Sequence, residues 1–393
     1  MNILKRNIRS SKLYMNIKSW IISKLYIFPI QTNKIVFDNF GGRGFGDDPK
    51  YIAKELLSRD INLKLIWVTT DPTIDLPQGI QTVKYGTIRA AYHWITAKVW
   101  VDNIKSTIRP PKRNGQYYIQ TWHSTLGFKK NEADAENLPI HYIEQAKKDG
   151  KQIDLMYSNN DFRYDKYTNR FWYSGEVIKC DVPRIGELFC KDREKIDRVY
   201  SNLKINLNKK IVLYAPTFRK NIDKSIYHLN ANEICKSLEK KFGGKFEFVI
   251  RLHPNDKEIA NEIVKEMNVV DATDYPDMQE LLSVVSILIT DFSGTMFDFG
   301  FTRKPVFLYA KDVERYIKQE RKWYFGLDQV PFTLSQTEDE LIECIVKFDI
   351  EKYIHECALF EKKIGFVDSG NGSKIIADRI LKEITKENIT NGK

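Results

Sequence analysis

Residues 246–254 read FEFVIRLHP, an apolar and aromatic run that ends in an arginine, a histidine and a proline. The run Phe246–Ile250 has the length and composition of a buried strand. In an open α/β sheet, ligands bind just outside the carboxyl ends of the strands. Arg251 and His253 are therefore expected at the edge of a sheet where such proteins bind substrates, which predicts an enzyme.

Two further segments repeat this arrangement. The runs Tyr117–Ile119 and Ile287–Ile289 each read as a short buried strand. The first is followed by QTWHST at residues 120–125, and the second by TDFSGT at residues 290–295. A histidine, an aspartate and several hydroxyl side chains are thus expected at the same kind of sheet edge.

Strand and helix patterns alternate along most of the 393 residues. Strands are predicted at residues 35–37, 63–68, 99–101, 117–121, 154–158, 210–214, 246–250, 269–271, 287–289 and 306–309. This order predicts parallel sheets in an α/β fold. A charged helical stretch over residues 187–208 separates two similar halves, which indicates GT-B architecture: two Rossmann-like domains with a cleft between them. The expected domains are residues 33–195 and 196–393.

The charge is unevenly distributed. The net charge is +10, and residues 1–30 hold six basic residues and no acidic one, which leaves about +4 for the rest of the chain. This remainder has no long basic block, which argues against a nucleic-acid-binding protein. The five cysteines form no C-x-x-C pair, so we expect reduced thiols in the cytoplasm and no zinc site.

Residues 1–32 form a separate basic segment in which apolar residues recur at three- and four-residue steps. This pattern predicts an amphipathic helix lying on an anionic membrane surface. A helix packed on the protein with a solvated basic face is the alternative. The apolar stretch over residues 20–30 is too short to span a bilayer, and no signal-peptide cleavage site follows it.

Each polar segment has a functional and a structural interpretation. Ser293 and Thr295 at a helix start can bind phosphate, and ordinary capping of the helix by Asp291 or Ser293 is the alternative. Arg251 and His253 share one face of their strand end and suit a pyrophosphate, while a surface histidine beside a turn is the alternative. His123 is a candidate general base or a structural histidine.

A glycine-rich turn, FGGRGFGD at residues 40–47, follows the first predicted strand. It lacks the G-x-G-x-x-G register of dinucleotide-binding proteins. Gly41 and Gly42 allow a substrate to approach the backbone closely, or they only form a tight loop.

Taken in order, these segments resemble the CDP-glycerol:poly(glycerophosphate) glycerophosphotransferase family, which includes teichoic-acid polymerases and primases and related capsule enzymes. The resemblance rests on VFDNFGG at 36–42, DDPKYI at 47–52, QTWH at 120–123 with Lys129 and Lys130, Pro183-Arg184, LYAPTFR at 213–219, RLHP at 251–254, TDFS at 290–293 and the segment 321–325. It implies a GT-B fold over nearly the whole chain.

The resemblance also implies a reaction. An acceptor hydroxyl attacks the β-phosphate of a CDP-alditol, usually CDP-glycerol, and CMP leaves as a phosphodiester forms on a lipid-linked polymer or saccharide. His123 resembles the general base, and His253 with Arg251 resembles the pyrophosphate-stabilising pair. The remaining residues implied on the donor side are Arg219, Asp291, Ser293, Thr295 and Arg321, and those on the acceptor side are Gly41, Gly42, Trp122 and Ser124.

The resemblance implies no tightly bound cofactor, with a divalent ion such as Mg²⁺ as an optional aid, and a peripheral enzyme on the cytoplasmic face of the membrane. The chain departs from the family pattern at Ser124, where the family has glycine, and at Gly294, where it has a second serine. The Pro-Arg turn also lacks the usual Asn-Asp. These departures leave open the acceptor and the alditol, so that a CDP-ribitol-dependent transferase is an alternative. A glycosyltransferase using a CMP- or UDP-sugar and a non-catalytic membrane scaffold are the further alternatives.

Overall fold

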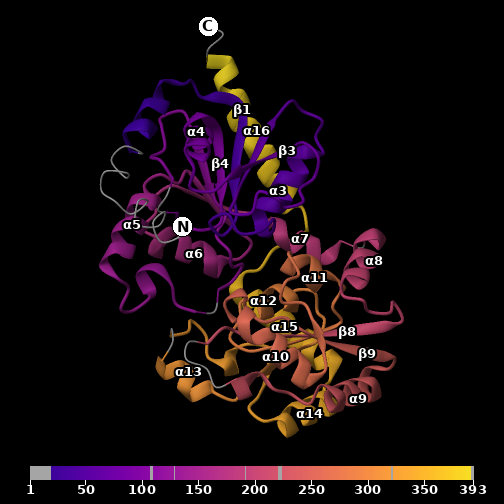
Figure 1. The fold of residues 1–393 in the computed structure, drawn as a ribbon. Helices are drawn as coiled ribbons and strands as arrows, with labels where there is room; N and C mark the ends of the chain where they lie inside the picture. The colour runs from indigo at the N-terminus through magenta and orange to yellow at the C-terminus, as the bar shows by residue number, and fades with distance from the viewer. Residues whose placement is uncertain are drawn as a thin grey trace, which may run out of the picture.

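The computed structural model describes residues 19–106, 109–127, 129–190, 192–219, 224–319 and 322–390. These residues form two α/β domains, one above the other in Figure 1. Most of the predicted basic segment, residues 1–18, lies outside the described residues, as does Arg321.

The N-terminal domain is built on a seven-stranded sheet of order β3-β2-β1-β4-β5-β6-β7, with every neighbouring pair parallel. Its strands are β1 (Gln31–Asp38), β2 (Lys64–Thr69), β3 (Ile80–Lys84), β4 (Ala97–Asp102), β5 (Tyr117–Gln120), β6 (Leu155–Ser158) and β7 (Glu176–Lys179). Its helices are α3 (Asp47–Leu57), α4 (Ile88–Thr96), α5 (Ile140–Gly150) and α6 (Asp161–Arg170). Strand β4 is buried throughout, and β1 is buried over residues 34–38, which include its apolar run Ile35–Phe37.

The C-terminal domain has a six-stranded parallel sheet of order β10-β9-β8-β11-β12-β13. Its strands are β8 (Lys209–Ala215), β9 (Lys245–Ile250), β10 (Val270–Asp271), β11 (Ile287–Thr290), β12 (Val306–Tyr309) and β13 (Thr333–Ser335). Its helices are α9 (Ala231–Phe242), α10 (Lys257–Met267), α11 (Met278–Val284), α12 (Thr295–Gly300), α13 (Val313–Gln319), α14 (Glu338–Lys347) and α15 (Ile350–Ile364). The ten predicted strands are confirmed, whereas β3, β7 and β13 had no matching prediction.

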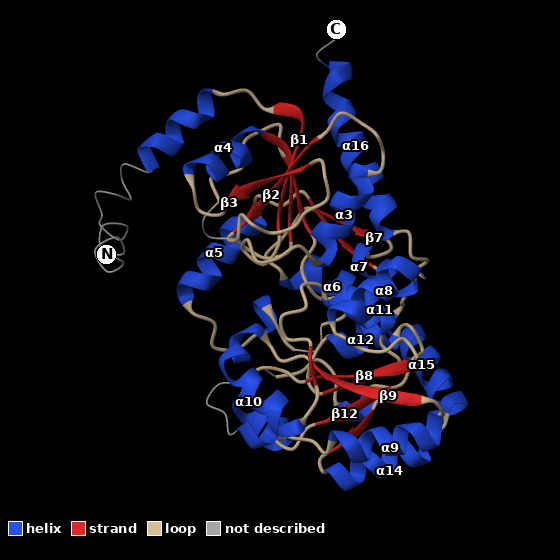
Figure 2. Cartoon of the chain, turned by 45° about the vertical axis from the view of Figure 1, so that its right-hand side comes forward, coloured by secondary structure: helices blue, strands red, loops and turns tan. Residues whose placement is uncertain are grey.

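Two helices, α7 (Pro183–Phe189) and α8 (Arg193–Asn202), connect the sheets, and the predicted division near residue 195 falls within this connection. The last helix, α16 (Gly372–Thr390), does not follow that division. It crosses back and packs on α3, α7, β1 and β4, so it lies beside the N-terminal sheet in Figure 2. Its buried apolar residues Ile376, Ala377 and Ile380 explain this placement.

The carboxyl ends of the two sheets face each other. Ser124, just beyond β5, lies opposite Gly294, just beyond β11: a Cβ atom on Gly294 would be 3.7 Å from Oγ of Ser124. The polar segments expected at strand ends therefore meet between the domains. We call the surroundings of His123, Ser124, His253 and Gly294 the interdomain site.

Candidate active site

His123 follows β5 and is held by a hydrogen bond of 2.8 Å between its Nδ1 and the backbone carbonyl oxygen of Asn103. A carbonyl oxygen can only accept, so Nδ1 carries the proton and Nε2 of the neutral ring keeps its lone pair. The ring is open to solvent. Desolvation by the surrounding protein lowers the pKa of His123, and Arg184 and Arg163 act in the same direction. His123 is thus a neutral base with an available Nε2.

Aromatic rings fix the orientation of His123. Trp122 is buried, has a φ of 58° and stacks on the His123 ring with centroids 4.5 Å apart. The ring of Phe40 meets His123 edge-on at 5.5 Å. The predicted acceptor-side residue Trp122 therefore acts as a support for the histidine.

The glycine-rich turn places Phe40 beside His123. Gly41 and Gly42 have φ values of 69° and 84°, which favour glycine. The Gly42 N–H donates to the Asp38 carboxylate at 2.6 Å, and its carbonyl accepts from the Thr70 N–H at 2.7 Å. A Cβ on Gly42 would lie 3.0 Å from the Thr70 nitrogen, so a side chain has no room there.

His253 follows β9 and has the opposite arrangement of its ring nitrogens. Its Nδ1 accepts a hydrogen bond of 3.1 Å from the Asn255 N–H and so caps the short helix Pro254–Asp256. The proton of the neutral ring must then be on Nε2, which can donate. Desolvation lowers the pKa of His253, and the cations Arg43, Lys129 and Arg251 lower it further.

These three cations come from both domains. Arg43 belongs to the glycine-rich turn, Lys129 follows the β5 segment, and Arg251 is at the end of β9. Arg251 donates from Nη1 to the Tyr275 carbonyl at 2.6 Å, which fixes its guanidinium. Several cations gathered around one donor histidine suit a ligand with two adjacent negative charges, such as a diphosphate.

Ser293 and Thr295 lie at the start of α12, as predicted. Oγ of Ser293 lies 2.9 Å from Oγ1 of Thr295 and accepts from the Thr295 N–H at 3.3 Å. Both residues remain partly exposed. They therefore present a fixed pair of hydroxyl groups beside Gly294.

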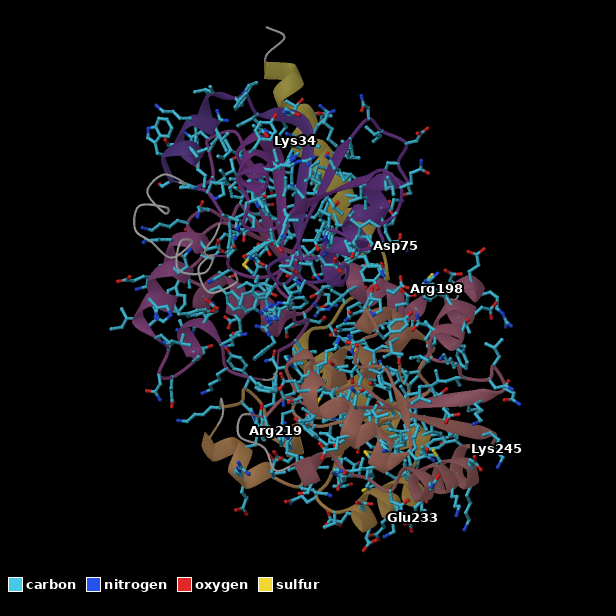
Figure 3. The ribbon with its side chains drawn as sticks, in the orientation of Figure 1. Lys34, Asp75, Arg198, Arg219, Glu233 and Lys245 are labelled. Atoms are coloured by element: carbon cyan, nitrogen blue, oxygen red, sulfur yellow. The ribbon has the colours of Figure 1, made fainter. Side chains whose placement is uncertain are left out.

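Arg219 and Asp291 were expected to contact phosphate, but in the structure they bind each other. Nη2 of Arg219 lies 2.8 Å from the Asp291 carboxylate, and its Nε lies 2.9 Å from Asp312. Asp291 also accepts from the Thr217 backbone N–H at 2.9 Å. Arg219 is only 7% exposed and lies in the C-terminal domain in Figure 3. This geometry supports the loops after β8 and β11 rather than an open phosphate contact.

Sequence reasoning missed a network that connects the two domains through Arg184 of α7. Its Nε lies 3.1 Å from Asp298 of α12, its Nη1 lies 2.9 Å from Asp47 of α3, and its Nη2 donates to Thr125 at 2.7 Å. Asp47 accepts from the Asn103 side chain at 3.0 Å, and the Asn103 backbone holds His123. The Pro183-Arg184 motif gave a signal for Arg184, but Asn103 had none beyond its place after β4.

The described residues contain no cluster of three or more His, Cys, Asp or Glu side chains arranged to hold a metal ion. The two aspartates on the C-terminal side of the site, Asp291 and Asp298, are paired with Arg219 and Arg184. These residues do not fit a resident Mg²⁺ site.

Residues 21–382 match the sequence profile of the CDP-Glycerol:Poly(glycerophosphate) glycerophosphotransferase family. The chain belongs to this family. It is therefore an enzyme of the glycerophosphotransferase type, and the predicted family, fold class and reaction type are confirmed.

Relatives of this glycerophosphotransferase cover nearly its whole length. It is 28% identical to the teichoic acid poly(glycerol phosphate) polymerase of Bacillus spizizenii over 94% of this chain and 97% of the relative. It is also 28% identical to the teichoic acid glycerol-phosphate transferase of Staphylococcus aureus, over 97% and 99%. The corresponding polymerase of Staphylococcus epidermidis is 27% identical, and this chain spans 52% of its length.

Solved structures of the wall teichoic acid polymerase TagF have the same fold. One aligns with a TM-score of 0.83 at 25% identity and covers 98% of each chain. A histidine-to-asparagine variant soaked with CDPG aligns with a TM-score of 0.80, also at 25% identity, over 96% of this chain and 100% of the other.

Proposed function

We propose that this glycerophosphotransferase transfers glycerol phosphate from CDP-glycerol to a hydroxyl group of a lipid-linked teichoic acid or capsule-type acceptor and releases CMP. The observation that carries the proposal is the opposite protonation of two histidines in one interdomain site. His123 offers a lone pair on Nε2, and His253 offers a proton on Nε2. The names of its polymerase relatives support the choice of donor and acceptor.

The two histidines act at opposite ends of the transfer. The acceptor hydroxyl gives its proton to Nε2 of His123 while its oxygen forms a bond to the β-phosphorus. The bond from that phosphorus to the bridging oxygen breaks, and CMP leaves with the electron pair. Negative charge grows on the diphosphate oxygens during this step. His253 and Arg251 donate hydrogen bonds to these oxygens and so stabilise the transition state.

Desolvation by the surrounding protein and nearby cations keep both histidines in the states that this reaction needs. The pKa of each is lowered, so His123 is neutral near pH 7 and is ready to accept a proton. His253 donates from Nε2 in its neutral form. The scheme involves no divalent ion, because the site's aspartates Asp298 and Asp291 are paired with arginines.

We also assign the enzyme to the cytoplasmic face of the membrane as a peripheral protein. Trp20, Ile27 and Phe28 are exposed apolar residues beside the basic N-terminal segment. Apolar and basic residues together favour an anionic lipid surface, where a lipid-linked acceptor is anchored. No helix in the described ranges has the length and apolar character needed to cross a bilayer.

The direct test is release of CMP from CDP-glycerol in the presence of a lipid-linked polyol-phosphate acceptor. The proposal predicts acceptor-dependent release with CDP-glycerol. Release with CDP-ribitol alone would change the assigned alditol, and transfer from a CMP- or UDP-sugar would replace the reaction. No release with any of these donors would overturn the proposed function.

A further inference from the structure

A buried arginine lies behind Ser124 and has no carboxylate partner within the described ranges. Arg163 of α6 is 0% exposed, and its Nη2 lies 3.4 Å from Oγ of Ser124. Its Nε and Nη1 have no hydrogen-bond partner among the residues that the structure describes. A buried cation is costly unless it is paired or hydrogen-bonded, so this arrangement calls for a nearby anion.

The backbone is shaped to accept this guanidinium. Gly127 has a φ of 74°, and a Cβ at this position would lie 1.4 Å from Nη2 of Arg163. Tyr167 and Phe171 lie on other sides, with the guanidinium carbon 5.5 Å and 6.0 Å from their ring centroids. Gly127 and the two aromatic rings therefore form a preformed binding space for a guanidinium beside Ser124.

The contact with Arg163 determines how the Ser124 hydroxyl is directed. A guanidinium can only donate, so Oγ of Ser124 accepts, and its own O–H is available to donate elsewhere. Ser124 is partly exposed. It faces Gly294, between the hydroxyl-bearing Ser293 and Thr295 on the opposite wall.

The two departures from the family pattern thus meet in space. The resemblance described from the sequence leads one to expect a glycine at position 124 and a serine at position 294, where this chain has Ser124 and Gly294. A Cβ on Gly294 would lie 3.7 Å from Oγ of Ser124, so the two side chains would compete for neighbouring space. A hydroxyl group carried by residue 294 would therefore lie close to the one that Ser124 carries.

We infer that Ser124, oriented by Arg163, donates a hydrogen bond to the transferred phosphoryl group of the donor. This inference rests on the proposed function and assigns Ser124 to the donor instead of the acceptor. Arg163 is a positioning residue, and its charge adds long-range attraction for the phosphoryl group. The field of a buried cation is weakly screened, so a phosphate is favoured over a neutral ligand.

The test compares three variants with the wild-type chain. Ser124→Ala removes the hydroxyl group. The paired exchange, Ser124→Gly together with Gly294→Ser, moves the hydroxyl group to the facing position 294. Thr168→Ala is the control. Thr168 is an exposed hydroxyl on the same helix as Arg163. The readouts are kcat/KM for CMP release from CDP-glycerol, the Kd for CDP-glycerol by calorimetry, and Tm.

We expect Ser124→Ala to lose about tenfold or more in kcat/KM for the donor, as for a lost hydrogen bond to a charged group. Its KM for the acceptor should stay unchanged, and its Tm should fall modestly because Nη2 of the buried Arg163 loses its contact with the Ser124 hydroxyl. The paired exchange should recover most of the loss, and Thr168→Ala should match the wild type. Wild-type kinetics for Ser124→Ala, or no recovery in the exchange, would overturn the inference alone. A wild-type chain that neither binds CDP-glycerol nor releases CMP would overturn the proposed function as well.

Discussion

Arg184 of α7 and Asp298 of α12 form a buried ion pair between the two halves of the molecule, with Nε 3.1 Å from Oδ2 and side-chain exposures of 3% and 7%. The same guanidinium also binds Asp47 beneath His123. The position of His123 is thereby connected to the C-terminal domain, which carries the hydroxyl groups of Ser293 and Thr295.

Replacing Arg184 with methionine should therefore strongly destabilise the protein. The change leaves Asp47 and Asp298 buried without their counter-ion, and breaking such a pair costs about 3–5 kcal/mol. Urea unfolding measures the effect. Arg193→Met removes an exposed pair with Asp197 and should change stability little. An Arg184→Met protein as stable as this control would refute the structural role of the pair.

The glycine-rich turn offers a matched comparison. Gly42 and Gly44 both have positive φ, but only Gly42 is crowded, by Thr70 and Tyr85 at 3.0 Å, while Gly44 has open space within 4 Å. Alanine adds backbone strain at both positions and overpacking only at the first. We expect Gly42→Ala to be less stable than Gly44→Ala by about 1–3 kcal/mol, measured by denaturant unfolding. Equal losses of unfolding free energy in the two variants would show that Thr70 and Tyr85 shift to accommodate a side chain at position 42.

His253→Asn separates catalysis from folding. Asparagine is a good helix cap, so the contact with the Asn255 N–H survives, but the Nε2 donor is lost. We expect kcat to fall about 10²–10³-fold with little change in Tm. A variant that retained kcat within a few-fold of the wild type would rule out His253 as a transition-state donor.

Trp20→Ser tests the membrane assignment. Trp20 is 62% exposed in a short helical stretch over residues 19–24. Burying a large apolar side chain contributes enough free energy that its loss should weaken binding to anionic vesicles by about tenfold. Vesicle sedimentation measures this binding. Ile140→Ser is the control, because Ile140 is 76% exposed on α5, outside the N-terminal segment. Equal effects of the two changes would contradict the assignment.

Local sequence patterns predicted the strands and the residues at their ends. His123, His253 and Ser293 each follow a short apolar run, and such runs carry enough local information to place a residue at a sheet edge. Ser124 and Gly294 lie opposite each other because of the arrangement of the two sheets, and no local sequence pattern predicts that proximity.

The remaining features depend on contacts between distant segments. The pairing of Arg219 with Asp291 joins residues 72 positions apart, and Arg184 with Asp298 joins residues 114 apart. From sequence alone, a charged residue at a strand end is interpreted as a ligand-binding residue, because its ion-pair partner within the protein is not known. The return of α16 to the N-terminal domain likewise depends on which surface is left uncovered, and the amphipathic pattern of a helix does not contain that information.

The pH dependence of CMP release tests the central claim, that neutral His123 is the base. The lowered pKa of His123 keeps its lone pair available at pH 7, so kcat/KM should be flat near neutrality. It should fall only as the pH drops through a midpoint below the ordinary value of about 6.5. His123→Ala should lose about 10²–10⁴-fold in rate together with this acidic limb. An acidic limb that persists in His123→Ala, or a wild-type midpoint above pH 7, would contradict the account.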